Sequence, residues 1–217
     1  MRVLSFPLLE FKKILYYHRT FDEYRKLSRE VESLRARLVG LEEVIRENTR
    51  LEKLLQFKRT LVYQSVSAGV IGRDPTRWNS SMIIDRGSDH GIIVGQAVVN
   101  ALGVVGKIAE VSESTSKVIL LTDPQFSVAG LVQRPRESGL VSGTLQGLCR
   151  IKFISEDADI QPGDIVITSK LSSSFPESLL IGEIIEIVEN PRGSSKECIV
   201  QPAVSVSQIE EVLVIIK

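Results

Sequence analysis

The sequence predicts a mainly β protein with an N-terminal α-helical coiled coil and two small six-stranded β-barrels. Three observations support this fold class. Residues 1–60 contain 14 Lys and Arg against 9 Asp and Glu, whereas residues 61–217 contain 13 against 18. Of the 15 Gly, 14 follow residue 60, and so do 7 of the 8 Pro. Apolar residues follow a helical repeat before this border and form short β-branched runs after it, so we expect a domain boundary near residue 60.

The segment 21–60 is expected to form a coiled-coil helix. It contains no Pro and a single Gly, and strong helix formers dominate it. Its apolar residues are spaced alternately by three and four positions, which is the period of a supercoiled helix. We therefore predict that a second copy of the chain packs against them. The predicted dimerisation residues are Tyr24, Leu27, Val31, Leu34, Leu38, Leu41 and Ile45.

The residues beside this seam favour two parallel helices. Glu30 would face Arg35 of the partner helix, and Arg37 would face Glu42, so both pairs have opposite charges. Exposed pairs contribute only about 0.2–1 kcal/mol each, so they select orientation more than they drive association. Asn48 interrupts the apolar series, and we expect the coil to slip or splay there. A single helix packed on its own globular domain is the alternative.

Residues 61–217 are expected to form twelve short strands separated by turns rich in Gly, Pro, Asn and Asp. Such spacing, without helical patterns in between, is typical of β-barrels and sandwiches. Twelve strands suit two barrels, and we expect the division between them near Leu140. The expected strands are Val66–Val70, Ser81–Asp85, Ala97–Asn100, Val104–Val111, Lys117–Thr122, Ser127–Val132, Leu140–Thr144, Arg150–Ile154, Asp164–Thr168, Gly182–Val188, Glu197–Gln201 and Val212–Ile216.

We find no set of catalytic residues in the sequence and expect a protein that is not an enzyme. His90 is the only His after residue 60, and it lies in a polar turn. A Ser-His-Asp triad needs such a base beside a presented nucleophile, and no GxSxG or GDSGG-like segment is present. The carboxylates of Glu156, Asp157 and Asp159 are interpreted as a solvated acidic loop.

Neither a metal, a cofactor nor a nucleic acid is expected as a ligand. A structural zinc site needs about four N or S ligands, but the chain has two Cys and two His. The acidic β region also lacks the basic, aromatic-rich surface of a nucleic-acid binder. The sequence leaves open whether Cys149 and Cys198 form a disulfide. No stretch is long and uncharged enough for a membrane span.

An ordered series of motifs over residues 47–217 resembles the MreC family of rod-shape-determining scaffolds of bacterial cell walls. The most specific part is Gly163–Ser169, followed by Phe175-Pro176 and Ile181–Glu183. Lys170 and Ser178 depart from it, because the family usually has Gly at both positions. The other matching segments are Glu47-Asn48, Leu51–Leu55, Val70–Pro75, Trp78-Asn79, Ile84–Gly91, Gly103–Lys107 and Leu120–Asp123.

The resemblance implies a coiled coil followed by two barrels of chymotrypsin-like topology without a triad. It implies a homodimeric or filamentous scaffold on the extracytoplasmic face of the membrane. The implied partners are MreD, a class B penicillin-binding transpeptidase and, indirectly, MreB. The family has an N-terminal transmembrane helix, and residues 1–20 are similar to the juxtamembrane segment that follows it. We therefore expect contact with the membrane only through a segment absent from this sequence.

Within this interpretation, the β domain (61–217) presents strand edges or a groove to the transpeptidase. Two alternatives of other classes remain open. A periplasmic adaptor of an envelope export complex also joins coils to β domains, but it needs a helical hairpin. A hydrolase of chymotrypsin-like fold would need His90 as its base.

Overall fold

The computed structural model describes the backbone of residues 6–60, 63–74, 80–188 and 195–216, and the side chains of these ranges except 6–24, 36 and 60. The chain divides into two compact units, residues 1–52 and 53–217. The motif residues Pro75, Trp78 and Asn79 lie outside the described residues.

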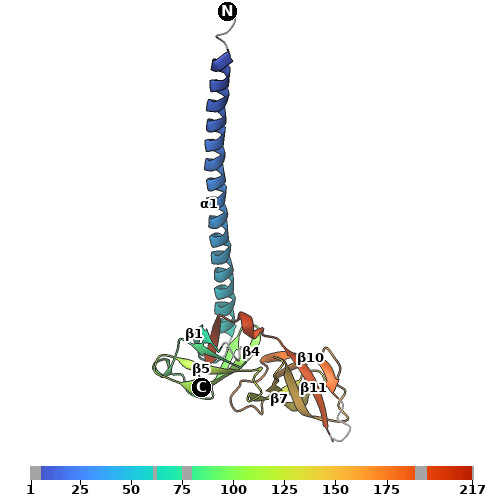
Figure 1. The fold of residues 1–217 in the computed structure, drawn as a ribbon. Coiled ribbons are helices and arrows are strands. Elements are labelled where there is room, and N and C mark those ends of the chain that lie inside the picture. Colours follow the sequence, from blue (N-terminus) through green and yellow to red (C-terminus); the bar gives the residue numbers. More distant parts are fainter. Residues whose placement is uncertain (1–5, 61–62, 75–79, 189–194, 217) are drawn as a thin grey trace, which may run out of the picture. The chain divides into compact units, whose positions relative to one another are not determined.

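One helix, α1 (Phe6–Thr60), makes up nearly the whole N-terminal part of the chain (Figure 1). It begins well before residue 21, where we expected the coil to start. Pro7 lies in its first turn, where a missing N–H costs no intrahelical hydrogen bond. Lys58 and Arg59 lie in the last turn, where positive charge is favourable. The helix runs unbroken through Asn48, so any slip of the coil there leaves the helix itself intact.

The described residues after α1 form twelve strands, which confirms the expected number and order. They close into two antiparallel barrels with the strand orders β1-β12-β3-β4-β5-β2 and β10-β11-β8-β7-β6-β9 (Figure 1). The strands are β1 (Ser65–Arg73), β2 (Ser81–Ile84), β3 (Ala97–Asn100), β4 (Gly103–Val111), β5 (Ser116–Leu120), β6 (Ser127–Val132), β7 (Glu137–Gly143), β8 (Cys149–Ser155), β9 (Ile165–Thr168), β10 (Leu180–Val188), β11 (Ser195–Pro202) and β12 (Glu211–Ile215). Two short 3-10 helices, η1 (Ser88–His90) and η2 (Val206–Gln208), lie in the connections.

The division between the barrels differs from the expected one. Leu140 lies inside β7, in the second barrel, and the chain changes barrel earlier, between β5 and β6. It then returns to the first barrel with β12, which pairs with β1 and β3. Our expectation assumed that each barrel is one continuous stretch of chain. The hydrophobic pattern does not reveal the return, because β12 looks like any other buried strand.

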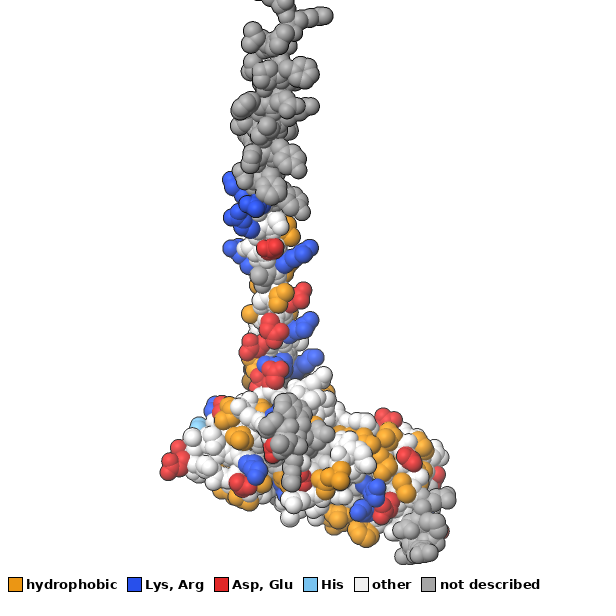
Figure 2. Space-filling model, in the orientation of Figure 1, with side chains coloured by type: hydrophobic (Ala, Val, Ile, Leu, Met, Phe, Trp, Pro, Cys, Tyr) orange, Lys and Arg blue, Asp and Glu red, His pale blue; other side chains and the backbone are white. Residues whose placement is uncertain are grey.

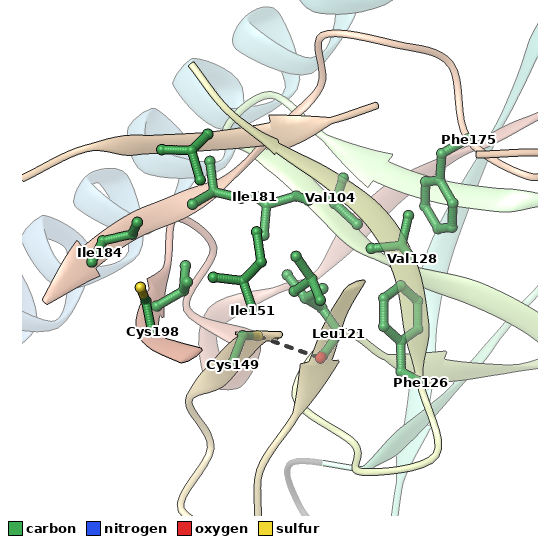
Figure 3. Packing of buried hydrophobic residues seen from close by; sticks show 14 of the residues in the cluster. Val104, Leu121, Phe126, Val128, Cys149, Ile151, Phe175, Ile181, Ile184 and Cys198 are labelled. Carbon is green, nitrogen blue, oxygen red and sulfur yellow. Dashed lines mark hydrogen bonds between the residues drawn. The ribbon is translucent and has the colours of Figure 1, made fainter. Parts of the chain in front are cut away.

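The first barrel buries both faces of two of its strands. In β3, Val98 faces the interior of its own barrel, while Ala97 and Val99 belong to the core shared with the second barrel. β12 divides in the same way, with Leu213 and Ile215 in the shared core. Runs of Val, Ile and Leu without polar alternation suit strands that are buried on both sides. The two barrels are therefore packed against each other through apolar side chains, as Figure 3 shows for part of the cluster.

The first of the two connections between the barrels, which joins β5 to β6, is largely buried. Leu121, Thr122 and Phe126 are almost fully buried. The backbone N–H of Leu121 donates to the carbonyl of Val105 at 2.9 Å, and Asp123 Oδ1 accepts the N–H of Gln125 at 2.7 Å. The Phe126 ring meets the ring of Phe175 edge-to-face, with the centroids 5.8 Å apart. Such a connection holds the barrels as one body.

Candidate functional site: two exposed apolar surfaces

The first candidate surface is the row of predicted dimerisation residues on α1, here called the helix seam. All of its described side chains are exposed in the single chain, with exposed fractions between 42% and 65%. Tyr24 lies outside the residues whose side chains are described. Figure 2 shows hydrophobic side chains interleaved with charged ones along the described part of the helix. The described members of the helix seam are Leu27, Val31, Leu34, Leu38, Leu41 and Ile45.

The last turns of α1 belong to the unit that contains the barrels. Leu54 and Phe57 pack against the shared core, whereas Leu55 between them stays 52% exposed. In a helix, residues three apart lie on one face, and their neighbours point elsewhere. The helix end is therefore anchored to the barrels by one face, while Leu55 lies on another face and stays exposed.

The second candidate surface begins at Phe153 in β8. Lys152 and Phe153 of β8 together lie opposite one residue of β11, Glu197. This two-against-one arrangement is a β-bulge. Phe153 takes the extra position with a φ of 62°, in the left-handed region. A bulky side chain there costs about 1–2 kcal/mol relative to an ordinary conformation.

The bulge decides which of two neighbouring apolar residues enters the core. Simple alternation from Cys149 and Ile151 would place Phe153 inside and Ile154 outside. Instead Ile154 is fully buried, and Phe153 is 68% exposed. Gly139 on β7 makes room, because a Cβ there would lie 2.6 Å from the Lys152 carbonyl oxygen. The strand thus turns an aromatic ring outward.

Three further apolar residues lie on the outward face of the second barrel, and with Phe153 they are here called the outer row: Ile167, Leu131, Leu140 and Phe153. Leu131 and Ile167 are half-buried, and the four do not form a continuous strip, because Leu131 pairs with Ser138 and Leu140 pairs with Ala129 and Lys152. Ile167 of β9 pairs directly with Leu131 of β6. Leu140 of β7 pairs with Lys152, which precedes Phe153. Their neighbours Val132, Val141 and Val166 are fully buried, so the row lies on the opposite, outward face of these strands. Figure 2 shows hydrophobic side chains gathered over this barrel.

The polar candidates from the sequence do not converge on a site. His90 is exposed at the end of η1. Of the acidic loop, Asp159 accepts a hydrogen bond from Arg134 Nη1 at 2.7 Å. Glu156 and Asp157 are exposed. Within the described ranges, no three His, Cys, Asp or Glu side chains gather as a metal site would require.

Arg134 instead forms a clamp at the entrance to β9. Its Nε donates to Asp164 Oδ1 at 2.7 Å, and its Nη2 donates to Asp164 Oδ2 at 3.0 Å. The side chain of Asp164 is only 7% exposed, and its Oδ2 also accepts the N–H of Gln161 at 2.8 Å. The Arg134 hydrogen bond, above all other causes, lowers the pKa of both Asp159 and Asp164. The arrangement closes a turn, and it offers no free group for catalysis.

The two cysteines are free and buried. Cys149 pairs with Val200, and Cys198 pairs with Ile151, so the cysteines are diagonal neighbours on β8 and β11. Diagonal Cα atoms lie about 7–8 Å apart, beyond the usual reach of a disulfide. The thiol of Cys149 donates to the Leu121 carbonyl at 3.5 Å (Figure 3).

Several motifs that carried the resemblance have a structural role. Asp85 Oδ1 accepts the N–H of Gly69 at 2.7 Å, which ties β2 to β1. At Gly87, a Cβ would lie 2.2 Å from the carbonyl oxygen of Ser112. The N–H of Ser88 donates to the same oxygen at 2.9 Å. The glycine therefore lets η1 dock against the turn between β4 and β5.

Comparison with known proteins shows to which family the chain belongs. The family model for rod shape-determining protein MreC, barrel core, matches residues 70–216. The chain belongs to the MreC family. A cell shape-determining protein MreC from Cereibacter sphaeroides is 28% identical over 170 residues, which cover 78% of this chain and 57% of that protein. The chain thus spans little more than half the length of this relative.

Solved MreC structures share the fold. One of them, described as MreC, has a TM-score of 0.74 at 27% identity and covers 80% of this chain and 99% of its own. A second is a complex between penicillin-binding protein PBP2 and MreC from Helicobacter pylori, with a TM-score of 0.60 at 14% identity, covering 71% of this chain and 98% of its own. At that identity the likeness concerns the fold alone. No helix in the described part of this MreC family member is long and apolar enough to cross a membrane.

Sequence reasoning located the helix seam but missed Phe153. From the sequence we expected a regular strand over Arg150–Ile154 and did not single out Phe153. The signal was the adjacent apolar pair Phe153-Ile154, which a regular strand buried on one face does not accommodate.

Proposed function

We propose that this MreC family protein is a non-enzymatic scaffold of the cell-wall elongation machinery on the extracytoplasmic face of the membrane. In this proposal it dimerises through the helix seam and binds a class B penicillin-binding transpeptidase and MreD, with MreB reached indirectly. The helix sets the spacing from the membrane, and the barrels present the binding surface. The PBP2 complex of the Helicobacter pylori relative supports the choice of a transpeptidase.

The observation that carries the proposal is the exposed helix seam. Burying a Leu, Ile or Val side chain stabilises by about 1.5–3 kcal/mol, and the six described side chains of the helix seam lie open to water. A second copy of the chain covers them with the same heptad pattern, and its charged flanks match in a parallel pair. The seam thus provides both the drive and the orientation for dimerisation.

Sedimentation velocity on the full chain tests the dimer. Leu34→Asp with Leu41→Asp places charges in the seam, and we expect the dimer to dissociate because burying an unpaired carboxylate is costly. Val39→Asp is the matched control, since Val39 is exposed but lies off the seam. A wild-type monomer, or a double variant that sediments like the wild type, would contradict dimerisation through this face.

A further inference from the structure

The positive charge of the helical part of the chain is concentrated in its first half. Residues 1–29 contain seven Lys and Arg against three Asp and Glu, whereas residues 30–60 contain seven against six. Arg25, Lys26 and Arg29 are the first cations of α1 whose side chains are described, and all three are exposed. Figure 2 shows Lys and Arg side chains gathered at the N-terminal end of the described part of the helix. This end of the helix therefore attracts anions.

The same part of the chain is rich in aromatic residues. Six of the twelve Phe, Tyr and Trp lie within residues 6–24. A site for nucleic acid also combines cations with aromatic rings, but eight of the twelve residues in 6–17 are hydrophobic. Many apolar and aromatic residues beside Lys and Arg are typical of helices at the boundary between a membrane and water. The composition thus favours a lipid surface over a nucleic acid.

The backbone places the apolar residues of this segment on one face of α1, here called the upstream face. Positions three, four or seven apart share a face of a helix, and α1 is helical from Phe6 onward. Arg25 and Arg29 follow Phe21 by four and eight positions, so they continue the same face. The apolar members of the upstream face are Leu8, Phe11, Ile14, Leu15 and Phe21.

The helix seam does not continue into the upstream face. Extended toward the N-terminus, the positions of the seam fall on Tyr17 and on three polar residues, Glu10, Lys13 and Thr20. A second copy of the chain that pairs through the seam therefore leaves the upstream face uncovered. Dimerisation and a second interaction can use different faces of the same helix.

We propose that residues 6–29 of α1 bind the surface of an anionic lipid bilayer. A helix with an apolar face and nearby cations binds such a surface by burying apolar area at the boundary of headgroups and acyl chains and by attracting lipid phosphates. The inference goes beyond the proposed function, in which the helix sets the spacing from the membrane. It also differs from the expectation that only a segment absent from this sequence contacts the membrane.

Flotation of the full chain with lipid vesicles at about 0.1 M salt tests the electrostatic part. The wild type should bind vesicles of phosphatidylglycerol and phosphatidylcholine at least about tenfold more tightly than vesicles of phosphatidylcholine alone. Arg25→Gln with Arg29→Gln should weaken binding to the anionic vesicles about tenfold or more. Arg46→Gln with Lys53→Gln is the matched control, because it removes the same charge from two exposed positions farther along α1. It should bind like the wild type.

A second variant tests the apolar part. Phe11→Gln removes a ring from the upstream face, and Gln is a good helix former, so the far-UV circular dichroism should not change. We expect binding to the anionic vesicles to weaken about tenfold. Val39→Gln is the control, because Val39 is exposed but lies beyond residues 6–29. If Phe11→Gln loses helical signal, the double arginine variant decides.

The inference is overturned if the wild type does not bind anionic vesicles, if it binds uncharged vesicles as tightly, or if the double arginine variant binds like the wild type. Equally tight binding of a DNA duplex, unaffected by Phe11→Gln, would assign the cations to polyanions in general and overturn it as well. Sedimentation velocity measures dimerisation independently of vesicles. The inference and the proposed function can therefore fail separately.

Discussion

Gly143 of the second barrel lies directly against the backbone of Thr122 in the connection between the barrels. A Cβ on Gly143 would lie 2.1 Å from the Thr122 carbonyl carbon and 2.5 Å from the Asp123 nitrogen. Both obstacles are backbone atoms, so no side-chain rotation could relieve the clash. This contact and the shared core hold the two barrels closely against each other.

Gly143→Ala should therefore destabilise the protein by about 1–3 kcal/mol, the range for overpacking a close-packed interior. Equilibrium denaturant unfolding measures the change. Gly72→Ala is the control, because a Cβ there would meet Ile83 Cδ1 at 3.7 Å, an ordinary contact. The control should be neutral or slightly stabilising. Equal unfolding midpoints for Gly143→Ala and the wild type would show that the contact is not tight.

Ser178 occupies a position where the family usually has Gly, and its φ is 66°. Ser178→Gly should stabilise the protein by about 1 kcal/mol, because glycine adopts this conformation without steric cost. The matched control is Ser155→Gly, at a strand end without positive φ, which should lose stability. Thermal unfolding of both variants gives the comparison. A loss of stability in Ser178→Gly would mean that the serine makes a compensating interaction.

The clamp of Arg134 on Asp164 should make stability depend on acid pH. The pKa of Asp164 is lowered in the folded protein, mainly by the Arg134 hydrogen bond. A lowered pKa means that the stabilisation is fully present above the unfolded value of about 4 and is lost as pH falls through the lower folded value. Asp164→Asn should thus have a lower free energy of unfolding than the wild type near neutral pH. The difference between the two free energies should become smaller below about pH 4. A difference in unfolding free energy that stays constant down to about pH 2 would contradict a stabilising role of the Asp164 carboxylate.

The rate at which the buried thiols of Cys149 and Cys198 react with a thiol reagent should measure opening of the second barrel. Burial raises the pKa of Cys149 to about 12 and that of Cys198 to about 11. Since the thiolate is the reactive form, both should resist a thiol reagent at about pH 8 until the barrel opens. An exposed Val39→Cys should react at once and serves as the positive control. Equally fast labelling of the native cysteines would contradict their burial.

Much of the fold follows from local patterns. The heptad over Leu27 to Ile45 predicted the exposed helix seam, and β-branched runs between turn residues predicted all twelve strands. These features depend on residues near one another in sequence. The helix begins at Phe6 and not at residue 21, as we expected, because residues with good helix propensity continue upstream of the heptad.

Features that depend on distant contacts could not be predicted in the same way. The return of β12 to the first barrel depends on pairing with β1, which is distant in sequence. The predicted division near Leu140 was wrong because it assumed that each barrel is one continuous stretch of chain. The outward position of Phe153 depends on a bulge against β11 and on the missing side chain of Gly139. The clamp on Asp164 joins residues 30 positions apart, and nothing in the sequence marks Arg134 as its partner.

Cysteine cross-linking along α1 tests the central claim most directly. With Cys149 and Cys198 replaced by Ser, Leu41→Cys places a thiol at a d position of the helix seam, where two parallel, in-register helices bring identical residues together. Mild oxidation should then convert the chain to a covalent dimer, while Val39→Cys, off the seam, should stay largely monomeric on a denaturing gel. Failure of Leu41→Cys to cross-link, or equal cross-linking at both positions, would contradict a scaffold that pairs through this seam.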